Sequence, residues 1–141
     1  MSSVRRERSR ALATWLAVLG GSFGLHRVYL HGARDPWAWL HPWPTLVGAY
    51  GFWRLRQFGI DDLLGSRLVP LLGAMLALSM LAAIVYGLTP AERWRVRFGE
   101  RGAGTGWVTV IGVVVALAVG ATATMATIAY TAQRYFELRA P

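Results

Sequence analysis

The sequence predicts an all-α integral membrane protein in which four helices span the bilayer and the first two form a short hairpin. Three observations predict this class. Apolar residues make up 55% of the 141-residue chain, which exceeds their share in an ordinary soluble domain. Two long stretches, residues 68–91 and 102–133, contain no charged residue. Seven tryptophans and 16 glycines are also typical of membrane proteins.

The first apolar run follows a short basic arm, residues 1–10. The run covers residues 11–25 and is uncharged, but about 20 residues are needed to cross the hydrocarbon core. It reaches that length only by extending through Leu30. A cleaved signal peptide is disfavoured because no small-x-small site closes the run. We therefore expect a short first span here.

The second apolar run, residues 36–53, carries two prolines near its start. Pro42 and Pro44 bracket Trp43, and each lacks the backbone N–H of a helix donor, so a straight helix through this point is not expected. A bent helix fits the pattern, as does a short interfacial segment followed by a helix from about Pro44. Either form completes a helical hairpin over residues 11–65.

The remaining segment, residues 66–141, predicts a second pair of membrane helices. In the run 68–91, Pro70 lies near the start, where proline destabilises a helix least, and Pro90 marks the end. In the fourth run, Trp107 and Tyr130 lie about 34 Å apart along a helix. That length nearly matches the hydrocarbon core, with an aromatic residue at each boundary.

Small residues recur every four positions in the fourth run, at Gly112, Ala116, Gly120 and Thr124. A shorter version of the pattern occurs in the third run, at Ser79, Ala83 and Gly87. This spacing places the small side chains on one face of a helix, where a second backbone can approach closely. We expect helix packing along this face, against another helix of the chain, a second copy or a different membrane protein.

A polar stretch, residues 20–36, separates the first two apolar runs. It contains four glycines, two histidines and two arginines. Lipid offers no partner for exposed backbone N–H and C=O groups. We therefore expect the chain to reverse direction in this stretch, at or beyond the lipid headgroups.

Five residues of the polar stretch carry a likeness to a known family: Gly24, His26, Arg27, Tyr29 and Leu30. Their pattern resembles the turn motif of the two-transmembrane-domain (TM2 domain) family, with Val28 where the family usually has Phe. The resemblance covers about residues 10–65 and implies an integral membrane protein with a helical hairpin. The family occurs widely in bacteria, and a few eukaryotic members are linked to signalling. Most members have no assigned molecular activity, so the resemblance implies none here.

The net charge is +8 and all 15 basic residues are arginine. They lie in short segments between apolar runs or at the termini, whereas a nucleic-acid-binding protein concentrates its charge on one face. We therefore expect contact with lipid headgroups and no nucleic acid partner. In the loop 89–106, Arg93, Arg95 and Arg97 alternate with apolar residues. An edge strand or a segment lying flat at the interface would alternate this way, and the flanking membrane helices favour the second.

The distribution of arginines also predicts orientation. With four spans, nine arginines share one side with both termini and six lie opposite, which predicts cytoplasmic termini. If the first run is instead re-entrant, leaving three spans, the division is ten against five and the C-terminus lies outside. The charge rule prefers three spans, whereas the hairpin of the resembled family favours four, which is our prediction.

No set of residues predicts catalysis or a metal site. The chain has no cysteine, and its histidines, at 26, 31 and 41, lack the spacing of a zinc site. Ser22 and Ser79 have no His–acid partners at a recognisable spacing. We therefore expect no enzyme activity and no cofactor.

The predicted function is that of a small multi-pass protein of a bacterial inner membrane, acting as an accessory, scaffold or assembly subunit. Its expected partners are the lipid bilayer and a membrane protein or a second copy of the chain. The alternative is a modulator or sensor of the lipid or ion environment, with the turn from Gly24 to Pro36 as its polar element.

Overall fold

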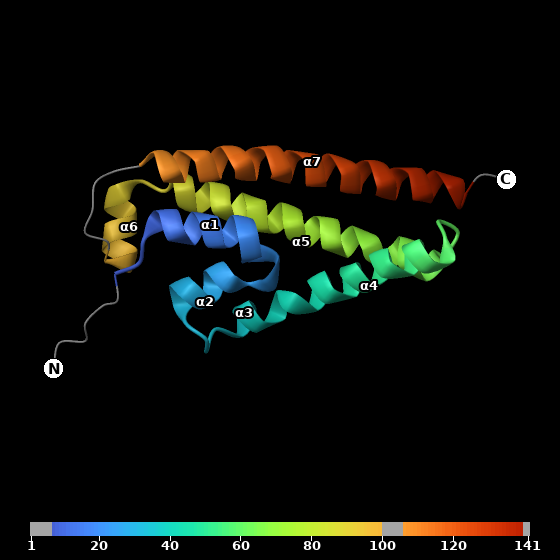
Figure 1. The fold of residues 1–141 in the computed structure, drawn as a ribbon, viewed down its shortest axis with the longest axis horizontal. Coiled ribbons are helices and arrows are strands. Elements are labelled where there is room, and N and C mark those ends of the chain that lie inside the picture. Colours follow the sequence, from blue (N-terminus) through green and yellow to red (C-terminus); the bar gives the residue numbers. More distant parts are fainter. Residues whose placement is uncertain (1–6, 100–105, 140–141) are drawn as a thin grey trace.

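The computed structural model describes residues 7–99 and 106–139, and these residues form helices joined by short turns, with no strand among them. In chain order the elements are α1 (Arg10–Gly20), the 3₁₀ turn η1 (Gly21–Phe23), α2 (Leu25–His31), α3 (Pro36–Leu40), α4 (Pro42–Phe58), α5 (Leu63–Leu88), α6 (Ala91–Phe98) and α7 (Trp107–Glu137). Figure 1 shows α5 in the middle of an elongated bundle, with α7, α1 and α4 packed along it. The predicted all-α class is confirmed.

Two helices, α5 and α7, are long and apolar enough to cross a membrane. They have 26 and 31 residues, or about 39 and 46 Å at 1.5 Å per residue. In each, only 22% of the most apolar 18-residue stretch is buried inside the chain, so most apolar side chains face outward. The helices α1 and α4 have 11 and 17 residues, and four spans are therefore not shown.

The helix α5 begins at a side-chain cap and ends at a proline. The Asp62 carboxylate accepts a hydrogen bond from the Gly65 N–H at 2.8 Å, which satisfies one of the free donors of the first turn. Pro70 lies within the helix without ending it. At the other end, Thr89 is extended and Pro90 follows it, as the sequence predicted.

The first reversal of the chain lies beside the middle of α5. The helix α1 runs antiparallel to the C-terminal half of α5 and stops at Gly20 (Figure 1). A Cβ on Gly21 would lie 2.6 Å from the Ser79 Cβ, so η1 packs tightly on α5. Gly24 then adopts a left-handed backbone, with φ at 79°, which turns the chain back into α2.

The first reversal therefore lies beside α5 and not at an end of the bundle (Figure 1). Protein groups satisfy the turn: the Gly24 N–H donates to the Gly21 carbonyl at 2.9 Å, and the Thr45 hydroxyl donates to the Ser22 carbonyl at 2.6 Å. Irregular backbone at membrane depth is tolerated where it is buried in protein. The reversal predicted for residues 20–36 is therefore split into η1 and a second turn at residues 32–35.

The second apolar run forms two helices, α3 and α4, which meet at His41 where the prolines predicted a bend. The helix α4 lies along the N-terminal half of α5 (Figure 1). Two glycines make the contact close. A Cβ on Gly48 would lie 2.3 Å from the Leu72 backbone nitrogen, and one on Gly51 would lie 2.6 Å from the Leu68 Cβ.

The arginine-rich segment forms the eight-residue helix α6 and not an edge strand. It crosses one end of the bundle (Figure 1). Its Trp94 is 1% exposed and packs with Ala13 of α1 and Leu30 of α2. The Trp94 Nε1–H donates to the Arg8 carbonyl at 2.7 Å. The helix α6 therefore fastens the start of α1 to the end of α5.

One core joins the two halves of the chain. Its buried members are Ala17 of α1, Met80 and Ala83 of α5, and Ala116 of α7. Residues of both predicted segments, 11–65 and 66–141, therefore pack in the same core.

Candidate functional site

The predicted turn motif lies on α2 and at its N-cap, and its members contact different parts of the bundle. A Cβ on Gly24 would lie 2.5 Å from the Ala38 carbonyl oxygen. The Tyr29 hydroxyl accepts a hydrogen bond from the Ser9 N–H at 2.9 Å, and Leu30 is buried against Trp94. These three residues therefore hold α2 to α3, α1 and α6.

His26, also in this motif, is buried, with 3% of its surface exposed. Its ring lies 5.6 Å from that of His41 and 5.7 Å from that of Tyr86, measured between centroids. Its Nδ1 is buried without a hydrogen-bond partner. His31 lies apart from this pair and its ring faces Phe98, at 6.3 Å. Among the described residues, no three His, Asp or Glu side chains come together as a metal site.

Arg27, the fifth residue of the motif, forms an ion pair with Asp35 across the second turn, with 2.9 Å between Nε and Oδ2. Asp35 also caps α3 by accepting from the Trp37 N–H at 3.1 Å. Desolvation raises the pKa of Asp35, but the hydrogen bonds from Arg27 and Trp37 outweigh it and keep that pKa below its ordinary 3.8. The pair fixes the geometry between α2 and α3.

A pocket of about 370 Å³ lies between α2, α6 and the end of α5. We call it the α6 pocket. Four cationic or titratable side chains line it, namely Arg27, His31, Arg93 and Arg97. Three aromatic side chains form much of its remaining wall, namely Tyr86, Trp94 and Phe98. The alternation of arginines does not by itself predict this site, because only a helix places residues four apart on one face.

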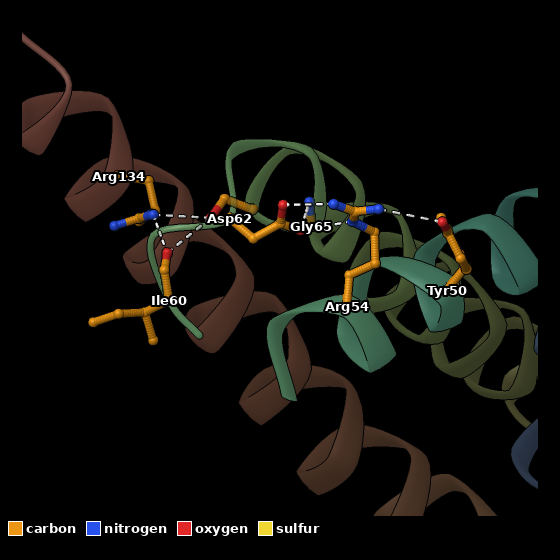
Figure 2. Close-up of polar contacts among 7 residues, drawn as sticks. Tyr50, Arg54, Ile60, Asp62, Gly65 and Arg134 are labelled. Carbon is orange, nitrogen blue, oxygen red and sulfur yellow. Dashed lines mark hydrogen bonds and ion pairs between the residues drawn. The ribbon is translucent and has the colours of Figure 1, made fainter. Parts of the chain in front are cut away.

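The opposite end of the bundle holds a polar network between α4, α5 and α7 (Figure 2). The Arg54 guanidinium donates twice to the Asp62 carboxylate, and both distances are 2.8 Å. The Arg54 Nη1 also lies 3.4 Å from the Tyr50 hydroxyl. The two hydrogen bonds from Arg54 lower the pKa of Asp62 to about 2. This network joins the C-terminal part of α4 to the cap of α5.

Arg134 extends the same network to α7. It donates to the Ser66 hydroxyl at 2.9 Å and to the Ile60 carbonyl (Figure 2). It also pairs with Glu137 at 2.6 Å. The turn between α4 and α5 is thereby tied to the last part of α7.

The predicted packing stripe on α7 divides into a buried and an exposed part. Gly112, Ala116 and Gly120 are buried, facing α1 and α5. Thr124 is exposed, and its hydroxyl donates to the Gly120 carbonyl at 2.7 Å. Beyond Gly120 along the chain, α7 contacts α5 through Thr127. A Cβ added to Gly73 of α5 would overlap the Thr127 hydroxyl. The shift follows because a strict four-residue repeat drifts around a helix with 3.6 residues per turn.

The shorter stripe on α5 is buried throughout, at Ser79, Ala83 and Gly87. Ser79 donates to the Met75 carbonyl of its own helix at 2.6 Å. The Ser79 hydroxyl therefore forms a hydrogen bond within its own helix.

An open groove of about 380 Å³ runs along α7 where α1 ends. We call it the α7 groove. Its lining is apolar and small: Leu76 of α5, with Ala118, Val119, Thr122, Ala123 and Ala126 of α7. Leu76 also packs against the core cluster that contains Ala17 of α1. The groove therefore begins at the point where α1 leaves the surface shared by α5 and α7.

The arrangement suits binding and helix packing. Arg54, Asp62 and Arg134 hold helices together, and the arginines of α2 and α6 line the α6 pocket. Comparison with known proteins finds no matching family model, no matching curated protein and no matching solved structure. The resemblance to the TM2 domain family stays a prediction.

Proposed function

We propose that the chain is a multi-pass protein of a bacterial inner membrane with three crossings and one re-entrant hairpin. The crossings are the bent pair α3–α4, then α5 and α7. The hairpin is α1 with α2, which enters and leaves on the side of α6. Three features support this: the half-length of α1, the reversal beside Ser79, and the outward-facing apolar surface of α5 and α7.

The arginines support the same topology. Seven described arginines lie on segments at the α6 end of the bundle: Arg8, Arg10, Arg27, Arg34, Arg93, Arg95 and Arg97. Five lie at the other end: Arg54, Arg56, Arg67, Arg134 and Arg139. The side richer in arginine faces the cytoplasm. The α6 end is therefore cytoplasmic and the end of α7 is outside.

Within this topology the protein is a non-catalytic accessory or assembly subunit that seats one transmembrane helix of a partner in the α7 groove. One observation carries this function: α1 fills only half of the surface that α5 and α7 share, and the other half is open. Small residues line that half, so another helix backbone can approach closely, which drives association in lipid. A partner helix would continue the line of α1.

Site-directed crosslinking tests this function. The chain has no cysteine, so Thr122→Cys introduces a single reactive site in the groove. Ile128→Cys is the matched control, because Ile128 is also exposed on α7 but does not line the groove. In native membranes we expect Thr122→Cys to give one protein adduct of defined mass and Ile128→Cys to give none.

A second change shows that the adduct depends on the groove. Ala126→Leu, added to Thr122→Cys, fills the groove with a larger side chain and should abolish the adduct. Equal adducts at positions 122 and 128, or an adduct that survives Ala126→Leu, would contradict the proposed docking.

A further inference from the structure

The α6 pocket combines positive charge with an aromatic wall at the boundary where α5 ends. Arg93 and Arg97 are four residues apart on α6, which places them on one face of the helix. Arg27 and His31 line the pocket from α2, on the other side. Cations from two separate elements therefore converge on one space of about 370 Å³.

The positive charge of this pocket is only partly neutralised. None of the described residues that line it carries a carboxylate. Among the described residues, the one ion pair that engages these side chains is Arg27 with Asp35. Burial lowers the pKa of His31, and the nearby Arg27 guanidinium lowers it further. Arg97 lies 5.5 Å from the centre of the Phe98 ring.

The side chains that line the α6 pocket indicate which class of ligand it can bind. Guanidinium groups bind phosphate through paired, charge-assisted hydrogen bonds. The aromatic wall of Tyr86, Trp94 and Phe98 gives the same space an apolar side. Val85 lines the pocket and is 54% exposed on the outer face of α5, so the pocket opens toward the surface that we assign to lipid. An anion with an attached apolar chain fits both sides.

We propose that the α6 pocket binds a phosphate-bearing anion, with Arg93 and Arg97 as its main ligands and Arg27 opposite them. The phosphate belongs either to the headgroup of an anionic phospholipid or to a soluble phosphate compound. The site lies at the α6 end and shares no residue with the α7 groove, so it stands independently of the proposed docking function.

Binding measurements on the purified full-length chain test the site. The probes are short-chain phosphatidate, short-chain phosphatidylcholine and inorganic phosphate, each titrated by calorimetry in a non-ionic detergent. We expect saturable binding of phosphatidate and weaker binding of phosphatidylcholine. Binding of phosphatidate without inorganic phosphate assigns the site to a lipid headgroup. Saturable binding of both assigns it to the phosphate group itself.

Matched variants on one helix separate the pocket from general charge. Arg93→Gln and Arg97→Gln each remove one proposed ligand and should weaken phosphatidate binding by about tenfold. Arg95→Gln removes the same charge from α6 outside the pocket and should leave the affinity within about twofold of that of the unmodified chain. Circular dichroism and the elution volume confirm that each variant is folded. Equal losses in all three variants, or no saturable binding of phosphatidate or of inorganic phosphate, would overturn the proposal.

Discussion

Arg54 holds Asp62 through two parallel hydrogen bonds, from Nε to Oδ2 and from Nη2 to Oδ1, each 2.8 Å long (Figure 2). The same carboxylate caps α5 through the Gly65 N–H. Asp62 thus serves two elements at once, because it ends the turn from α4 and starts the central helix. Bidentate pairing of this kind fixes geometry as well as charge.

The stability of the bundle should depend on pH through Asp62. Its pKa in the folded chain is about 2, against an ordinary 3.8, because of the Arg54 hydrogen bonds. A folded-state pKa below the unfolded value stabilises the fold above about pH 4, and this contribution is lost as the pH falls toward 2. We expect the Tm in detergent to fall over this range. Asp62→Asn should remove that part of the dependence.

The neighbouring acid provides the control for this experiment. Asp61 is exposed and forms no cap, so Asp61→Asn should keep the acid-dependent fall of the unmodified chain. A fall that persists unchanged in Asp62→Asn would show that other groups govern the acid response.

Thr45→Val should destabilise the reversal beside α5. The change keeps the shape of a side chain that is 3% exposed but removes the hydroxyl that donates to the Ser22 carbonyl. Leaving a buried acceptor without its donor costs about 1–3 kcal/mol. Equilibrium unfolding in mixed micelles measures the loss. Thr122→Val is the control, since that hydroxyl bonds only within its own helix on an exposed face, and we expect a change below about 0.5 kcal/mol.

Gly48→Ala should separate α4 from α5. The added Cβ would lie 2.3 Å from a backbone atom of Leu72, and a backbone cannot move aside as a side chain does. We expect a loss of about 1–3 kcal/mol in the free energy of unfolding. Ala49→Val enlarges the next residue, which is exposed on the same helix, and should be nearly neutral. Similar losses in both variants would place the contact elsewhere.

A reporter fused after Pro141 should be exported. The three crossings that we propose would put the end of α7 on the side opposite to α6, and the proposed orientation has α6 in the cytoplasm. A reporter active only outside the cytoplasm should therefore give a signal, and one active only inside should give none. The reverse result would support four spans with both termini inside.

Pattern alone predicted the two long helices and the helix interruption near the prolines, because uninterrupted apolar length and proline geometry are local properties. The burial of Gly112, Ala116 and Gly120 also follows from spacing on one helix. The depth of the first reversal could not be predicted this way. It depends on Thr45, which lies 23 positions away from the carbonyl that it satisfies.

The α6 pocket was missed for a related reason. The same alternation of arginines is compatible with a strand and with a helix. Only the helical geometry brings Arg93 and Arg97 to one face. The third wall comes from α2, more than sixty positions earlier in the chain. The close contact between α4 and α5 likewise depends on Gly48 and Gly51. These glycines are three positions apart, and no pattern in the sequence indicates which residues they contact.

The helix α1 has 11 residues against 26 in α5, and this difference has a consequence for assembly during synthesis. Its buried face, with Thr14 and Ala17, packs against α5 and α7, which follow it in the chain. During translation the hairpin therefore emerges before any surface exists to receive it. In the proposed topology the hairpin reaches its packed position only after α5 and α7 have been synthesised, so this step of assembly runs against the direction of synthesis.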